Sequence, residues 1–149
     1  MENKTHIGTQ NIGPMYYFTE KGSLVEGAER ILEMGSDVYK FSLDISLYPE
    51  TRDLKLPLIE AVKHKNCRKI FELPVKFYIM WAHGAMDNAI DKDFNINGGA
   101  LEKIYDEMYN LTHYLLNEYN GTGKVFLLGN WEGDWLLKGN TESRNGQAP

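Results

Sequence analysis

Strand and helix signals alternate along this 149-residue chain, and the alternation limits the possible folds more than any other feature. Short apolar runs rich in aromatic and β-branched residues predict strands, while apolar residues spaced three and four apart predict helices. The predicted strands cover residues 5–10, 38–43, 76–82 and 125–130. The resulting order, β-α-β-α-β-α-β, predicts an α/β fold built of βα repeats, with a parallel sheet, right-handed crossovers and helices outside.

Two of the predicted helices have clear sequence signatures. Ser23-Leu-Val-Glu26 has the form of a capping box, and the helix that it opens should end at Gly35. The helix over residues 100–119 carries the most regular apolar stripe. That stripe consists of Leu101, Ile104, Met108, Leu111 and Leu115.

Composition restricts the classes of function. A net charge of -5 argues against nonspecific binding to nucleic acid, and no apolar stretch is long enough for a membrane span. The single cysteine, Cys67, excludes an internal disulfide and a multi-cysteine metal site. No signal peptide precedes the first strand, so the compartment stays open. The length predicts one domain or part of one, followed by a polar terminal loop over residues 139–149.

Alternation along the strands predicts which side chains face the helices and which face the opposite side. In the second strand Tyr39 should pack against the helices, which leaves Lys40 and Asp44 on the other face. Trp81 and His83 share a face at the end of the third strand. Polar side chains from all four strands should therefore meet at one rim. They are Gln10, Lys40, Asp44, His83, Asn130 and Glu132.

The fourth strand runs directly into acids, an amide and two tryptophans. Glu132 and Asp134 alternate with Trp131 and Trp135 immediately after Asn130. In parallel α/β folds the chemistry gathers at the carboxyl ends of the strands. Indole rings that stack on sugars, beside a carboxyl group that moves protons, are what a carbohydrate-processing cleft requires. The alternative is a strand end followed by a glycine turn, with the tryptophans packing only.

With this cluster after three βα units, the chain resembles the N-terminal half of a (β/α)8-barrel (TIM-barrel) glycoside hydrolase, of the clan whose acid/base glutamate follows the fourth strand. The resemblance implies that residues 1–138 form the first four βα units. It also implies that Glu132 is the general acid/base and that Asn130 binds the sugar. Two departures are visible: Trp131 separates the asparagine from the glutamate, and the nucleophile expected after the seventh strand falls beyond the last residue.

The expected ligand is a carbohydrate, and no cofactor or metal site is expected. The isolated chain should be inactive, and it should self-associate or require a missing second half. Two alternatives remain open: a non-catalytic carbohydrate-binding or pseudoenzyme module, and a small self-contained doubly wound α/β binding domain. The expected substrate-binding side chains are Gln10, Lys40, Asp44, Trp81, His83, Asn130, Trp131, Asp134 and Trp135.

Overall fold

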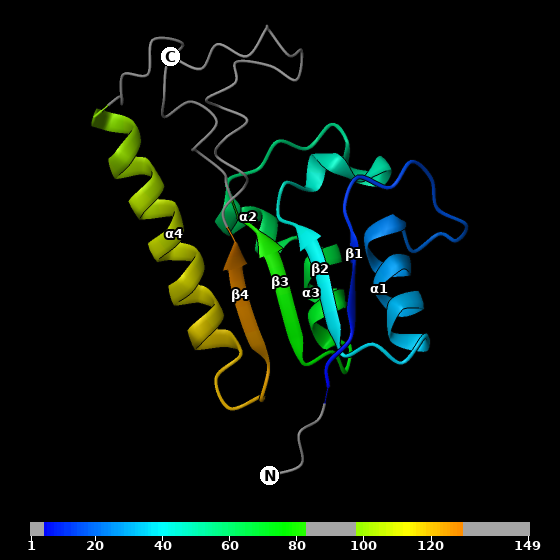
Figure 1. The fold of residues 1–149 in the computed structure, drawn as a ribbon. Helices are drawn as coiled ribbons and strands as arrows, with labels where there is room; N and C mark the ends of the chain where they lie inside the picture. Colours follow the sequence, from blue (N-terminus) through cyan, green and yellow to red (C-terminus); the bar gives the residue numbers. More distant parts are fainter. Residues whose placement is uncertain (1–4, 83–97, 130–149) are drawn as a thin grey trace, which may run out of the picture.

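The computed structural model describes residues 5–82 and 98–129 (Figure 1). The predicted strands form a single sheet in which every pairing is parallel. Its order, β1-β2-β3-β4, follows the order of the strands in the sequence. The prediction of an α/β fold with a parallel sheet is therefore confirmed. The strands are β1 (Gly8–Asn11), β2 (Val38–Ser42), β3 (Phe77–Trp81) and β4 (Val125–Gly129).

Helices occupy each of the three connections between the strands. Two short 3₁₀ helices, η1 (Ile45–Leu47) and η2 (Pro49–Thr51), precede the helices that join β2 to β3. The longest helix begins beyond the carboxyl end of β4 in Figure 1, which explains why Leu101 of the predicted stripe is 53% exposed. Leu111 and Leu115 of the same stripe are buried. The α-helices are α1 (Ser23–Glu33), α2 (Leu58–Lys63), α3 (Lys65–Glu72) and α4 (Gly98–Glu118).

All of these α-helices cover the same face of the sheet. The hydroxyl of Tyr39 on β2 donates to the carbonyl of Leu24 on α1 at 2.9 Å. The ring of Phe126 on β4 lies 5.4 Å from Phe71 of α3 and 5.3 Å from Tyr119, which follows α4. In Figure 1, α2 and α3 lie behind the sheet, which leaves its opposite face toward the viewer. The predicted alternation in β2 is confirmed, because Tyr39 is fully buried on the helix side.

The strand order distinguishes between two architectures that the sequence leaves open, a half-barrel and a doubly wound sheet. A doubly wound sheet reverses its strand order at a switch point and carries helices on both faces. The part of the sheet that the structure describes has no such reversal, since each successive strand is added to the same side of the one before. Right-handed crossovers that always step in one direction place their helices in one layer. The doubly wound arrangement is therefore not the one observed.

The centre of the core is aromatic and buried between the sheet and α3. The ring of Phe71 lies 6.1 Å from Phe41, 5.1 Å from Tyr78 and 5.3 Å from Tyr119, in addition to its contact with Phe126. These partners come from β2, β3, β4 and the end of α4. One side chain thus links three strands with the helix layer.

The predicted capping box at the start of α1 is wrong. The residue before the helix is Gly22, with φ 83°, and the Ser23 hydroxyl donates instead to the carboxylate of Glu50 at 2.7 Å. Glu26 turns back to the preceding loop, where it accepts the N–H groups of Phe18 and Thr19. An acid 27 residues away in the sequence thus caps the helix, which a local pattern could not indicate.

We expect Gly27→Ala to destabilise the fold, although alanine is the better helix former. A Cβ at position 27 would stand 2.7 Å from Cγ of Asn11. The Asn11 amide cannot retreat easily, because it donates to the Ser23 carbonyl at 2.9 Å and to the Tyr39 hydroxyl at 3.0 Å. Steric strain of about 1–3 kcal/mol exceeds the propensity gain of about 0.5–1 kcal/mol.

Urea denaturation of the wild type and both glycine variants measures this difference. Gly98→Ala is the matched control, since nothing lies within 4 Å of the position of its Cβ at the start of α4. It should change the free energy of unfolding by less than about 0.5 kcal/mol. A Gly27→Ala protein as stable as the control would show that α1 does not approach β1 closely.

Among the described helices, none is long and apolar enough to cross a membrane. α4, the longest of them, has charged residues along its length and packs on the sheet through Leu111 and Leu115.

Candidate functional site

The candidate site lies on the face of the sheet that the α-helices leave uncovered. Strand register arranges its side chains in rows that run across the four strands. Most are apolar and half-buried, and Leu127 is 48% exposed. The row nearest the carboxyl ends contains Ser42, Trp81 and Gly129. The middle row contains Gln10, Lys40, Ile79 and Leu127, and the last contains Gly8, Val38, Phe77 and Val125.

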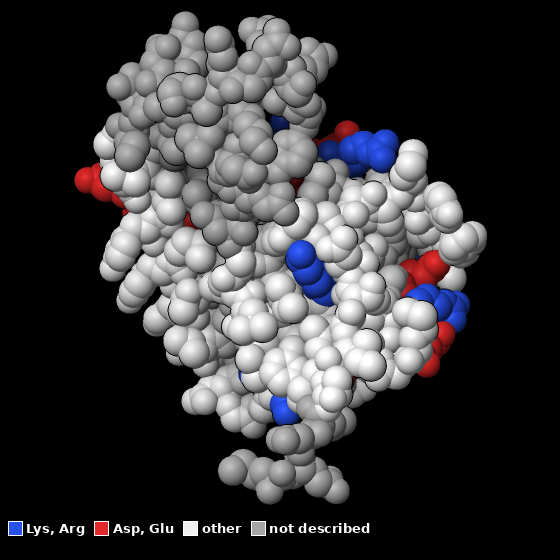
Figure 2. All heavy atoms as spheres, viewed as in Figure 1, with Lys and Arg blue, Asp and Glu red and all other residues white. Residues whose placement is uncertain are grey.

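Lys40 and Trp81 form the central contact of this face. The Lys40 ammonium lies over the Trp81 ring, 4.9 Å from its centroid, a distance typical of a cation–π interaction. Lys40 is level with Ile79 in the sheet, so Trp81 is its diagonal neighbour toward the carboxyl end. In the part of the chain that the structure describes, no carboxylate lies within ion-pair distance of Lys40. In Figure 2, which looks onto this side, isolated basic groups lie within a mostly uncharged surface.

Gln10 and Asp44 have different positions relative to this pair. Gln10 on β1 is exposed and directly opposite Lys40 in the register. Asp44 follows β2, and its carboxylate accepts the N–H of Ser46 at 3.1 Å and the Ser46 hydroxyl at 2.6 Å. Those two bonds close the turn into η1. The structure therefore brings Gln10, Lys40 and Trp81 together and uses Asp44 in a local cap.

The remaining predicted site residues lie outside the described residues. The predicted positions of Asn130 and Glu132 depend on residues that follow Gly129, the last described residue of β4. The predicted alternation places Phe126 and Leu128 on the same face as Asn130 and Glu132, and for the described part of the strand this is wrong. Phe126 and Leu128 pack against the helices, whereas Gly129 shares the face and the row of Trp81. The residues for which nothing is described are His83, Asn130, Trp131, Glu132, Asp134 and Trp135.

A polar cluster that the sequence did not indicate lies where the β2–α2 loop meets the start of α1. Burial favours a higher pKa for Glu50, but the Leu24 amide and the Ser23 hydroxyl outweigh it, and the pKa is lowered. The Thr19 hydroxyl, which donates to Glu26 at 2.7 Å, contributes most to lowering the pKa of that carboxylate. Both acids fix loops at the carboxyl end of the sheet. Their partners are set by tertiary contacts, so no sequence motif marks them.

Glu50→Gln should lower the free energy of unfolding by about 1 kcal/mol at neutral pH, because a charge-assisted bond at a helix N-terminus is lost. The lowered pKa of Glu50 means that its contribution is complete above the usual value of 4.5 and is lost as the pH falls through the folded value. The difference in free energy of unfolding between the wild type and the variant should therefore disappear at acidic pH.

Urea denaturation at several pH values between neutral and about pH 3 measures this difference in free energy of unfolding. Glu20→Gln, an exposed loop acid, is the control and should stay within about 0.5 kcal/mol of wild type at neutral pH. A gap for Glu50→Gln that widened as the pH fell would contradict the assignment of Glu50 as the cap of α1.

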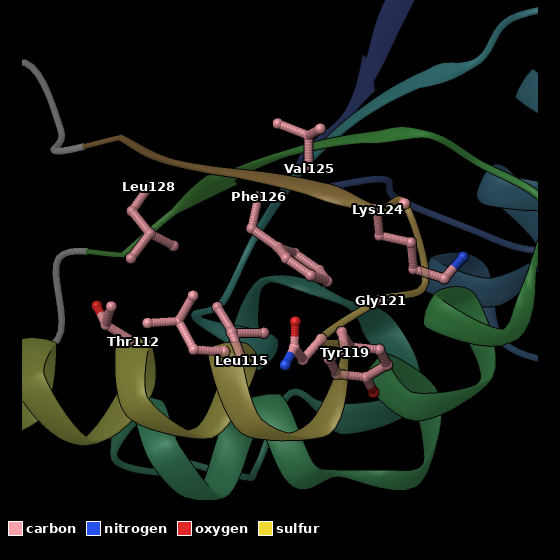
Figure 3. Close-up of a pocket in the computed structure, with 11 residues that line it drawn as sticks. Thr112, Leu115, Tyr119, Gly121, Lys124, Val125, Phe126 and Leu128 are labelled. Carbon is pink, nitrogen blue, oxygen red and sulfur yellow. The ribbon is translucent and has the colours of Figure 1, made fainter.

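A hollow of about 640 Å³ lies between the second half of α4 and β4, the last strand of the sheet. In Figure 3, Leu115, Phe126 and Leu128 point into it, while Val125 points to the other side of β4. At its end, the Lys124 ammonium donates to the Leu73 carbonyl at 2.8 Å, and burial lowers the pKa of Lys124. The lining is mostly apolar, so the hollow suits packing better than polar chemistry.

The described residues contain no group of three or more His, Cys, Asp or Glu side chains placed to hold a metal ion. No protein-family model, curated protein or solved structure matches this chain. The class that the fold defines is thus a parallel α/β protein of βα repeats, with helices on one face of the described sheet.

Proposed function

We propose that this chain is the first half of a (β/α)8-barrel glycoside hydrolase-like protein. In this proposal the uncovered sheet face is the inner wall of the barrel, and Glu132 is the general acid/base that acts on a glycosidic bond. The second carboxylate must come from another part of the barrel. The four βα units alone are therefore expected to be inactive, because glycoside hydrolysis requires a pair of carboxyl groups.

The observation that carries the proposal is the unidirectional strand order together with a single helix layer. In a (β/α)8 barrel each strand is added beside the previous one and all helices lie outside. The hollow between α4 and β4 is consistent with this, since a following βα unit would pack there, beside the last strand of the described sheet.

The chemistry of the uncovered face supports a carbohydrate ligand. Trp81 offers an indole near the carboxyl ends of the strands, where barrel active sites form. Gln10 supplies an amide that can donate and accept hydrogen bonds in the adjacent row. An aromatic ring beside a few polar groups is an arrangement that fixes a polar ligand in one orientation.

Titration of the chain with a panel of soluble oligosaccharides, followed by calorimetry, tests this proposal. The panel should contain α- and β-linked glucose, xylose and N-acetylglucosamine oligomers. Trp81→Ala should weaken binding of the preferred sugar about tenfold, since aromatic contacts contribute about 0.5–1.5 kcal/mol beyond burial. Tyr105→Ala, which removes a 68% exposed ring from α4, should leave binding unchanged. Equal affinities of the wild type and Trp81→Ala, or no binding of any sugar, would contradict the proposal.

One observation favours a second candidate, a carbohydrate-binding module without catalysis. The strands present an indole, an amide and an ammonium on the uncovered face, and no carboxylate among their described residues. Such a module would bind sugars in the same titration. It differs from the first candidate in giving no turnover when the barrel is complete.

A further inference from the structure

Lys40 is the one charged side chain that the described strands place on the uncovered face. The side chains nearest to it in the register are Gln10 on β1 and Ile79 on β3, and its ammonium lies over Trp81. Neither a neutral amide nor an indole neutralises a positive charge. The middle of an otherwise uncharged face therefore holds a single ammonium whose partner within the described residues is an aromatic ring.

All-parallel sheets occur almost only with both faces covered. Covering this face would remove water from Val38, Phe77 and Leu127, which is favourable, and from Lys40 as well. A dry interior that enclosed an unpaired ammonium would be strongly disfavoured, because the lost hydration must be replaced by an opposite charge. The charge thus restricts what can cover the apolar surface.

We infer that the surface that covers this face carries a carboxylate directed at Lys40. The partner is a second group of parallel βα units of different sequence, with an acid on its inner wall in the layer of Lys40. This inference rests on the proposed half-barrel, since it specifies the half that completes it. The acid and the ammonium form an ion pair inside the closed barrel.

A second copy of this chain is disfavoured as the partner, because it would bring a second ammonium to the same place. The interior layers of a (β/α)8 barrel take their side chains from alternate strands. In a two-fold dimer, β2 of the second copy becomes the sixth strand, so its Lys40 enters the same layer as the first. Two like charges would then share a dry interior, which is costly at an interface.

A charge-swapped copy of the chain supplies the missing acid and tests the inference directly. Wild type, Lys40→Glu and Lys40→Met are each studied alone, and wild type is mixed with Lys40→Glu in equal amounts. Light scattering over a range of micromolar concentrations gives the mass, for which one chain is 17.1 kDa. Circular dichroism establishes that each variant keeps its helices and strands.

We expect the mixture to form a dimer of twice the chain mass, at least about tenfold tighter than the self-association of either component. Lys69→Glu is the matched control, because Lys69 is exposed on α3. Its mixture with wild type should associate no more tightly than wild type alone.

The other outcomes overturn the inference and separate it from the proposed function. If wild type alone dimerises as tightly as the mixture, the partner is a second copy and the half-barrel stands. If Lys40→Met self-associates and the mixture associates no more tightly than Lys40→Met does, an apolar surface is enough to cover this face. The inferred carboxylate is then wrong and the half-barrel stands. If every sample stays monomeric and melts cooperatively, the inference and the half-barrel both fail.

Discussion

Phe71→Ala should lower the free energy of unfolding by about 3–5 kcal/mol, a large part of the stability of a domain of this size. The Phe71 ring is 1% exposed and lies between 5.1 and 6.1 Å from four other aromatic rings. Its loss leaves a cavity that β2, β3 and β4 all border. The rigid neighbouring rings cannot collapse into that space, so the loss should fall in the upper part of the range.

Phe18→Ala is the matched control for this change. The Phe18 ring is 83% exposed in the β1–α1 loop, so its removal should alter stability by less than about 0.5 kcal/mol. Thermal and urea unfolding, followed by far-ultraviolet circular dichroism, compare the two variants. A Phe71→Ala protein that unfolded at the wild-type urea midpoint would show that the aromatic cluster is not the centre of the core.

Under the proposed function, Glu132→Gln in a barrel completed by its second half should reduce glycoside hydrolysis about 10²–10⁴-fold, the usual contribution of a general acid/base. The loss should be largest for substrates whose leaving group needs a proton. In aryl glycosides of acidic phenols the phenolate leaves without that help. Cleavage of the glycosidic bond in these substrates should therefore be far less affected. Affinity for the oligosaccharide should change little, because the amide has the size and shape of the carboxyl group.

Steady-state kinetics with a series of phenyl leaving groups measures this dependence. Glu118→Gln, at the exposed end of α4, is the control, and it should retain most of the wild-type activity. Equal losses for good and poor leaving groups would show that Glu132 does not donate the proton. A completed barrel that binds sugar without turnover would favour the non-catalytic module.

Most of the architecture follows from the sequence because burial imposes periodicity. Leu24, Val25 and Ala28 repeat at helical spacing, and all three are buried against the sheet. Gly35 has the positive φ of 89° that ends a helix, as its position in the sequence predicts. These features depend on neighbours within one or two turns, which a single sequence contains.

What the sequence could not supply is the partner of each polar group across the fold. Alternation predicts that Lys40 lies on the uncovered face, but its contact with Trp81 depends on the register between β2 and β3. The same limit explains the wrong capping box, since the geometry that brings Glu50 to Ser23 is set by the packing of a loop. Register and loop packing are properties of the assembled chain.

At the amino ends of the strands, hydrogen bonds to backbone carbonyl groups join neighbouring segments of the chain. The Val125 amide donates to the Lys76 carbonyl at 2.8 Å, and the Phe77 amide donates to the Asp37 carbonyl at 3.0 Å. Lys124 adds its bond to the Leu73 carbonyl at this same end. These bonds lie at the end of the sheet opposite the loops that follow the strands, so substitutions in those loops leave them intact. In parallel α/β proteins this division lets the loops at the carboxyl ends vary in sequence while the strand pairing at the amino ends stays the same.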